Sequence, residues 1–240
     1  MERFITLENL IRLAEELAAN HRVLAPVVTG GIVTFRRFQP GMTIDLSRMA
    51  AVSPKAATFP QTETLLTVRR EHEDQKPELQ EVLPQGQNVV IGCRPCGARG
   101  KLVFDPVYET DKIKDPYYLQ RRNNTVFLTL TCDRPETTCF CHSVGGGPAD
   151  PAGSDVLLTL VEGGYVARSV TPRGEDILKT AVFEDAGDRG KTADEKQAAA
   201  RALMGEAHDY TTAPARLLAR FDDMDFRSEE HTSELQSRTV

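Results

Sequence analysis

The sequence predicts an α+β protein with mixed α/β character: a small central sheet, β-hairpins, flanking helices and a C-terminal helical connector. Apolar residues recur at helical spacing in several segments. Short runs rich in β-branched residues, bounded by glycine or proline, lie between those segments and are typical of strands. A chain of 240 residues, 40% of them hydrophobic, is also large enough to bury a core.

The first elements combine one helix with strands and a hairpin. Thr6 is a suitable N-cap for an amphipathic helix. Thr29-Gly30-Gly31 separates two apolar runs and predicts a β-hairpin. In order, we expect a helix over 7–20, hairpin strands over 22–28 and 32–38, loop over 45–60, an alternating segment over 61–68, a polar surface excursion over 69–88 and a buried strand over 88–92.

The remaining elements interleave helices with a second hairpin around Glu162-Gly163-Gly164. Asp115-Pro116 is typical of a helix start. We expect Leu102, Val103 and Val107 to face inward from the first of these helices. In order, we expect helices over 97–108 and 115–122, a strand over 125–131, hairpin strands over 155–161 and 165–170, and helices over about 173–183, 193–207 and 213–221.

Charge and hydropathy exclude several classes of protein. The net charge is −6, with 29 basic and 35 acidic residues, which argues against a nucleic-acid-binding surface. No run reaches the roughly 18 apolar residues that would span a bilayer. Acidic residues interrupt the apolar stripe of the first 21 residues, unlike in a signal peptide. We therefore expect a cytoplasmic protein without a membrane span.

The last fourteen residues, 227–240, differ in origin from the rest. Their RSEEHTSELQS stretch is the translation of a widely used sequencing adapter. We therefore expect 227–240 to be an artefact, to be excluded from fold reasoning. On this interpretation the natural chain continues beyond Phe226.

The five cysteines carry the chemistry. Cys93 and Cys96 follow the strand at 88–92, and the other three, Cys132, Cys139 and Cys141, follow the strand at 125–131. If these strands are neighbours, both groups lie at the same sheet edge. Clustered soft thiolates favour zinc or an iron–sulfur cluster. The C-x6-C-x-C spacing is neither a zinc ribbon nor a bacterial ferredoxin run. The alternative is a set of inert thiols with a C-x-x-C redox pair.

Residues near the cysteines could adjust the reduction potential of such a site. The small-residue loop 140–148 could donate backbone N–H groups, with Ser143, to sulfur, or could cradle a phosphate. His142 is a candidate ligand or proton carrier, or simply a polar loop residue. Arg94 and Arg99 would offset thiolate charge unless they are merely exposed to solvent.

Three segments resemble a known family: IGCRPCGARGKLVFDPVY, DPYYLQRRNNTVFLTLTC and CFCHSVGGGPADPAGSDVLLT. They are similar to the iron–sulfur subunit of anaerobic sulfite reductases and to hydrogenase β-chain-like dicluster ferredoxin proteins. The resemblance implies that Cys96, Cys132, Cys139 and Cys141 bind the iron of one [4Fe–4S] cluster. Cys93, commonly apolar in that family, is then a spare thiol or alternative ligand. Gly97 departs from the acidic residue often found there.

The resemblance also implies an organisation and a function. Residues 1–183 would form the cluster-bearing body, and 184–226 a helical connector to a C-terminal ferredoxin-like domain with two more [4Fe–4S] clusters. The protein would relay electrons between two partners in a cytoplasmic anaerobic complex, without being a catalyst itself. One partner would bind flavin or NAD(P)H, and the other would be a catalytic reductase or hydrogenase subunit. The rival hypotheses are a zinc-stabilised interaction module and a thiol switch using Cys93 and Cys96. Sulfite, hydrogen and other substrates stay open.

Overall fold

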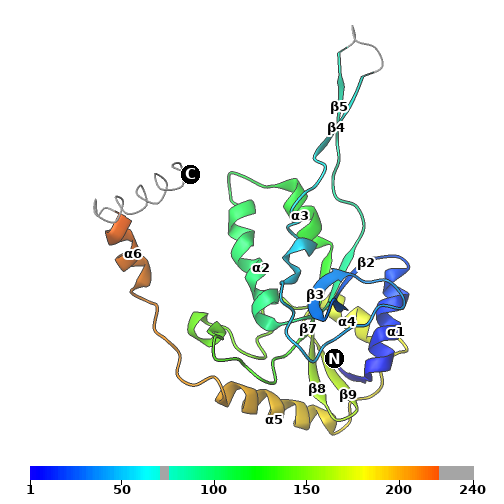
Figure 1. The fold of residues 1–240 in the computed structure, drawn as a ribbon, viewed down its shortest axis with the longest axis vertical. Helices are drawn as coiled ribbons and strands as arrows, with labels where there is room; N and C mark the ends of the chain where they lie inside the picture. Colours follow the sequence, from blue (N-terminus) through cyan, green and yellow to red (C-terminus); the bar gives the residue numbers. More distant parts are fainter. Residues whose placement is uncertain (71–75, 222–240) are drawn as a thin grey trace.

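A seven-stranded mixed sheet covered by helices on both faces forms the body of the protein (Figure 1). The computed structural model describes residues 1–70 and 76–221, and the α+β prediction is confirmed. The helices are α1 (Leu7–Ala18), α2 (Pro95–Tyr108), α3 (Pro116–Asn123), α4 (Pro172–Leu178), α5 (Arg189–Ala202) and α6 (Ala213–Phe221), with short 3-10 helices η1 (Pro54–Ala57) and η2 (Cys141–Val144). The strands are β1 (Glu2–Ile5), β2 (Arg22–Thr29), β3 (Ile32–Arg37), β4 (Leu66–Arg69), β5 (Glu78–Glu81), β6 (Asn88–Cys93), β7 (Thr125–Leu130), β8 (Val156–Val161) and β9 (Gly164–Ser169).

The strand order is β1-β9-β8-β7-β6-β2-β3, and β2, β6, β7 and β8 pair in parallel. Successive side chains of a strand point to opposite faces, so each strand feeds two cores. On one face, Leu10 of α1 and Leu178 of α4 join the larger core. On the other, Ala98 of α2 and Ala193 of α5 pack against the sheet. The carboxyl ends of four parallel strands therefore lie at one edge, where the cysteine loops begin.

The inward orientation expected for three residues of α2 is wrong. Leu102, Val103 and Val107 are 37%, 73% and 66% exposed. Ala98 and Lys101 face the sheet instead, and the Lys101 ammonium lies 3.9 Å from the centroid of the Phe127 ring. The long methylene stem of Lys101 packs like an apolar side chain. A pattern that counts only apolar residues leaves Lys101 out and therefore predicts the wrong buried face of α2.

Three features differ from the sequence expectations. The strand β1 is not among the expected elements; it pairs antiparallel with β9, and Phe4 also exchanges backbone hydrogen bonds with Glu184. Helix α4 ends at Leu178, earlier than expected. Helix α5 begins at Arg189 and buries Ala193 and Ala200. Part of the expected connector therefore packs against the body.

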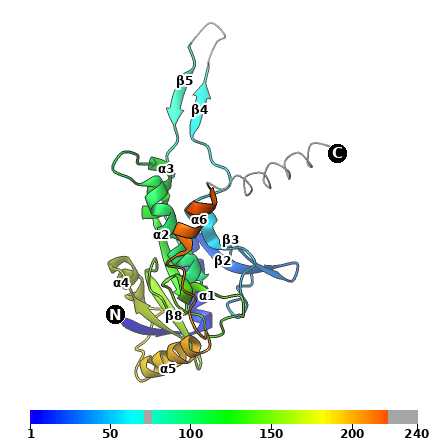
Figure 2. The same cartoon turned by 90° about the vertical axis from the view of Figure 1, so that its left-hand side faces the viewer.

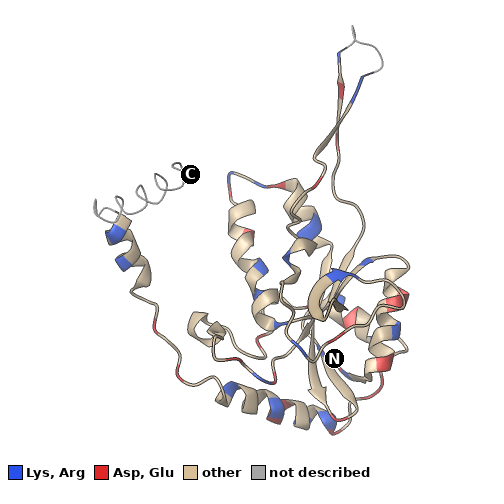
Figure 3. Cartoon of the chain, in the orientation of Figure 1, with Lys and Arg blue, Asp and Glu red and all other residues tan. Residues whose placement is uncertain are grey.

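Helix α6 stands apart from the body, and none of its residues is buried (Figures 1 and 2). Its charged residues, Arg216 and Arg220, are both basic (Figure 3). The segment 227–240, expected to be an artefact, lies outside the described residues. Within residues 1–70 and 76–221, no helix combines the length and the apolar character needed to cross a membrane.

A two-stranded ribbon of β4 and β5 projects from the body (Figures 1 and 2). β4 covers the end of the expected alternating segment 61–68, and β5 lies within the expected surface excursion 69–88. Both strands are exposed along their whole length. The Tyr117 hydroxyl lies 3.1 Å from both the Leu65 carbonyl and a Glu81 carboxylate oxygen, which ties the base of the ribbon to α3.

Candidate cysteine metal centre

The C-x-x-C pair spans the junction between β6 and α2. A register shift between Ile91 and Cys93 surrounds Gly92, whose φ is 79°. A Cβ at Gly92 would lie 2.4 Å from the Leu46 side chain, so this position requires glycine. Pro95 then occupies the first turn of α2, where its missing N–H costs no hydrogen bond.

The two cysteines of this pair lie in different environments. The Cys93 side chain is 1% exposed and packs in the core cluster with Ala98 and Phe127. Its thiol donates to the Arg94 carbonyl over 3.3 Å, and burial raises its pKa. Cys96, in contrast, is exposed on the first turn of α2. Cys96 is therefore the member of the pair that can reach a ligand at the sheet edge.

Of the other cysteines, Cys132 and Cys139 lie in the loop between β7 and η2, and Cys141 is the first residue of η2. β6 and β7 are parallel neighbours, as the sequence predicts, so this loop leaves the same edge as Cys93 and Cys96. The Cys132 N–H donates to the Pro148 carbonyl over 2.8 Å, closing the loop at its base. Cys139 and Cys141 are half-buried, and all five cysteines are free thiols.

The four thiols assigned as ligands from the sequence lie within electrostatic range of one another. Burial raises the pKa of Cys132 to about 11, and the charges of Cys96, Cys139 and Cys141 add to the shift. Burial also raises the pKa of Cys141, with Cys96 and Cys139 acting in the same sense. Bringing thiolates together is unfavourable without a cation, because like charges disfavour the ionised form.

The donor set fits a soft metal ion or an iron–sulfur cluster, because it offers four thiols from two loops at one edge. The arrangement is not a closed site: among residues 1–70 and 76–221, no group of three or more His, Cys, Asp or Glu side chains is positioned to hold a metal ion. The loops would have to draw the sulfur atoms together on binding.

Backbone N–H groups contact two of the sulfur atoms. The Glu136 N–H donates to Cys139 Sγ over 3.3 Å, and the His142 N–H lowers the pKa of Cys141 by a hydrogen bond. His142 lies within the loop 140–148 named from the sequence, whereas Glu136 precedes it. Two other members of that loop bond elsewhere: the Gly146 N–H donates to the Cys141 carbonyl over 2.8 Å, and the Ser143 hydroxyl accepts from the His208 N–H over 2.9 Å.

The two arginines differ in role. Arg94 donates to the Thr131 and Leu46 carbonyls over 2.8 and 3.3 Å, and its charge lowers the pKa of Cys132. Arg99 pairs with Asp150 over 2.9 Å, and the carboxylate offsets its charge. Arg94 is thus the cation that acts on the thiols.

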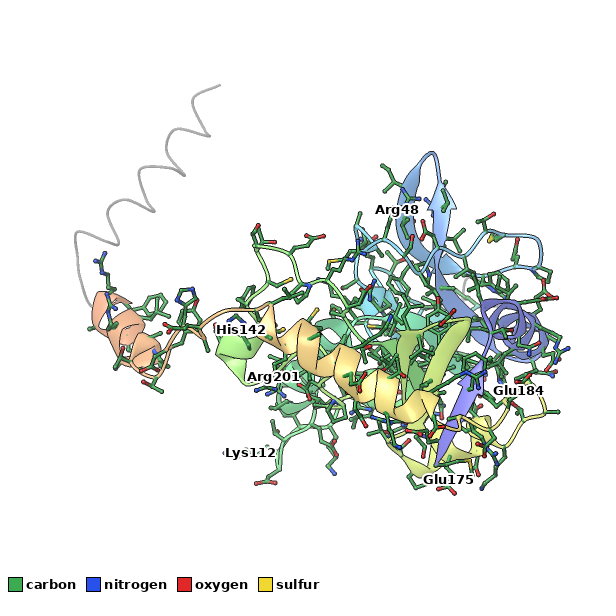
Figure 4. The ribbon with its side chains drawn as sticks, turned by 90° about the horizontal axis from the view of Figure 1, so that it is seen from below. Arg48, Lys112, His142, Glu175, Glu184 and Arg201 are labelled. Carbon is green, nitrogen blue, oxygen red and sulfur yellow. The ribbon has the colours of Figure 1, made fainter. Side chains whose placement is uncertain are left out.

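The contacts of the His142 ring do not favour a role as a metal ligand. Its Nε2 lies 3.1 Å from the Glu206 carbonyl, while Nδ1 is buried with no partner in the described part of the chain. His142 lines a cavity of about 540 Å³ with the glycine loop and Arg201 at the end of α5 (Figure 4). No signal in the sequence indicates these contacts, because residues 201–208 lie far away along the chain.

Comparison with known proteins gives one distant similarity. The chain is 32% identical over 113 residues to subunit beta of sulfhydrogenase 2 from Pyrococcus furiosus. The aligned stretch is 46% of this chain and 33% of that subunit, so the match spans about a third of the relative's length. No family model matches the sequence, and no solved structure matches it. Over less than half of its length, the chain is thus similar to a sulfhydrogenase β subunit.

Proposed function

We propose that this protein is an electron-transfer subunit of a hydrogenase- or sulfite-reductase-type complex, with a [4Fe–4S] cluster held by Cys96, Cys132, Cys139 and Cys141. The observation that carries the proposal is the position of these four thiols, on two segments at the carboxyl edge of β6 and β7, where Cys132 and Cys141 lie within electrostatic range of the other two. The similarity to a hydrogenase β subunit supports the same function. A bound cluster of this type accepts and releases one electron at a time.

The chain's own residues would set the environment of that cluster. The Arg94 charge stabilises thiolates and so opposes the negative charge of four sulfur ligands. N–H groups of Glu136 and His142 donate to sulfur, and such hydrogen bonds raise reduction potentials. The partial burial of Cys132 and Cys141 limits access of water.

The partners follow from this function. An electron relay needs a donor and an acceptor. We propose that a catalytic subunit is one of them and that a flavin- or NAD(P)H-binding subunit is the other. Residues 184–226 would connect the body to a further domain with two more clusters. In this proposal the complex works in the cytoplasm under anaerobic conditions.

Anaerobic reconstitution of the 240-residue chain with iron and sulfide tests the proposal. We expect a broad visible absorption band and about four irons per chain. Serine at Cys96, Cys132, Cys139 or Cys141 should lower the iron content sharply, because a hydroxyl is a poor substitute for a thiolate. The matched control is Cys93→Ser, which should retain the iron. Loss of iron in Cys93→Ser together with its retention in Cys96→Ser would contradict the ligand assignment.

The same samples distinguish the rival functions. A colourless protein with one zinc per chain would identify a structural zinc module. A thiol switch is disfavoured by the burial of Cys93, because a reactive thiol needs access and a lowered pKa. Rapid reversible formation of a Cys93–Cys96 disulfide would nevertheless establish that function.

A further inference from the structure

A cavity of about 980 Å³ lies beside the cysteine edge. It opens where β2 and β7 end, next to Cys132, and the loop 43–49 forms one wall. Ligands of sheets with parallel strands bind at the carboxyl edge, because loops there can vary without disturbing the core. The volume lies within the range of cavities that bind small molecules.

A buried tyrosine in this cavity lacks a hydrogen-bond partner. Tyr165 of β9 is 6% exposed and lines the cavity. Among residues 1–70 and 76–221, no group makes a hydrogen bond to its hydroxyl, although the charges of Arg94, Asp133 and Asp45 act on it. The ring is buried, whereas the hydroxyl oxygen itself is open to the cavity. A ligand in the cavity can therefore make a hydrogen bond to it.

Arg94 adds a cation to the same cavity. Its guanidinium donates to two backbone carbonyls, and no carboxylate of the described residues pairs with it. When a half-buried guanidinium bonds only to neutral oxygens, no negative charge offsets its positive charge. Of the other two arginines in the lining, Arg48 pairs with Asp45 over 2.7 Å and Arg134 is exposed to solvent. Arg94 is thus the half-buried arginine of the lining without a carboxylate partner among the described residues.

The other residues that line the cavity indicate which class of anion it can bind. Asp133 and Glu136 lie at the cavity beside Arg134, so the local charge disfavours a dianion such as phosphate. An apolar wall completes the cavity and suits a hydrocarbon group. Its members are Leu7, Val28, Leu130 and Leu160.

We propose that this cavity binds a small organic acid, with its carboxylate between Arg94 and the Tyr165 hydroxyl. The apolar part of the acid lies against Leu130 and Leu160. The site adjoins Cys132 but uses none of the four thiols, so the proposal goes beyond the proposed electron transfer and does not depend on it.

Calorimetric titration of the purified 240-residue chain with benzoate, acetate and inorganic phosphate tests the site. We expect benzoate to bind at least tenfold more tightly than acetate, because burial of the ring adds affinity, and phosphate to bind most weakly. Tyr165→Phe keeps the packing and removes one hydrogen bond to a charged group, which should weaken benzoate binding about tenfold. Tyr118→Phe is the matched control, since its hydroxyl bonds Asp105 elsewhere, and should bind like the wild type.

Three results would overturn the site: no anion binds, Tyr165→Phe binds benzoate as tightly as the wild type, or phosphate binds more tightly than benzoate. Arg94→Met should abolish binding, but Arg94 also ties two loops together, so the decisive variant is Tyr165→Phe. Iron analysis of reconstituted Tyr165→Phe separates the two proposals. Unchanged iron with weakened benzoate binding supports the site whatever the fate of the cluster assignment.

Discussion

The Met204 thioether sulfur lies 3.9 Å from Cys141 Sγ, although 63 residues separate the two in sequence. Two further contacts follow the same path: the Glu206 carbonyl meets His142 Nε2, and the His208 N–H donates to the Ser143 hydroxyl. Residues 204–208, here called the strap, therefore cross over the loop that carries Cys141. The strap shields that thiol from solvent on the side of α5.

Removing the Met204 side chain should expose Cys141. We expect Met204→Ala to raise the rate of Cys141 alkylation by iodoacetamide several-fold in the metal-free protein, since thiol reactivity follows access. Mass spectrometry of the cysteine peptides measures the rate, with buried Cys93 as an internal reference. Met49→Ala, which changes an exposed methionine elsewhere, should have no effect. Equal Cys141 rates in Met204→Ala and the wild type would show that the strap provides no shield.

An ion pair between a buried arginine and an exposed glutamate joins α3 to the loop before β4. Arg121 is buried; its Nη2 lies 2.7 Å from a Glu63 carboxylate oxygen, and its Nε donates to the Thr58 carbonyl. Glu63→Ala removes the carboxylate from a buried guanidinium, but water can partly replace it because Glu63 is exposed, so we expect the free energy of unfolding to fall by about 1.5 kcal/mol. Chemical denaturation measures the change.

The control for this pair is the exposed Arg12–Glu16 pair of α1, whose atoms lie 3.7 Å apart. Glu16→Ala should change stability by less than about 0.5 kcal/mol, because water screens exposed charges. If Glu63→Ala and Glu16→Ala lower the free energy of unfolding by the same amount, the Glu63 contact does not stabilise the protein more than an exposed ion pair does.

Much of the body could be predicted from the sequence because its signals are local. Thr29-Gly30-Gly31 and Glu162-Gly163-Gly164 mark two hairpins, and both form. The β-branched run at 125–131 gives β7, and its parallel pairing with β6 brings the two cysteine groups to one edge as expected.

The sequence predictions fail where tertiary contacts determine which residues are buried and which strands pair. Lys101 takes an inward position that periodicity assigns to apolar neighbours, and the partner of β1 lies more than 150 residues away at β9. Residue type alone identifies the cysteines, but it does not reveal their environment. Spacing alone does not distinguish Cys93 from Cys96; the family resemblance makes Cys93 the spare thiol, and in the structure Cys93 is buried and Cys96 is exposed. The strap and the unpartnered Tyr165 hydroxyl depend on contacts over long sequence distances.

Two glycines should respond oppositely to substitution by alanine. Gly100 lies within α2, and a Cβ there would meet no atom within 4 Å, so Gly100→Ala should raise stability by about 0.5–1 kcal/mol. At Gly174 of α4, a Cβ would lie 1.9 Å from the Asp155 carbonyl oxygen. Gly174→Ala must shift the helix away from β8, and we expect a loss of several kcal/mol. Thermal unfolding of both variants measures the two changes in stability. Equal unfolding midpoints of Gly100→Ala and Gly174→Ala would contradict the prediction.

Lys101 should make stability rise with pH in the alkaline range. Burial, reinforced by the nearby Arg122 charge, lowers its pKa from 10.5 to about 8. Between about pH 8 and 10 the folded chain has released this proton and the unfolded chain still holds it. The unfolded state then binds more protons, so the free energy of unfolding increases with pH. Above about pH 10 the buried Tyr118, whose pKa is raised, acts in the opposite sense.

Replacing Lys101 by methionine tests this directly, because the methionine stem keeps much of the packing against Phe127 without an ionisable group. In urea unfolding at about pH 7 and about pH 9.5, we expect the wild type to gain about 2 kcal/mol more than Lys101→Met between the two values. Lys112→Met, a change at an exposed lysine in the loop after α2, is the matched control and should follow the wild type. A wild-type slope that Lys101→Met reproduces would show that another group titrates, and that the Lys101 ammonium is stable where it lies.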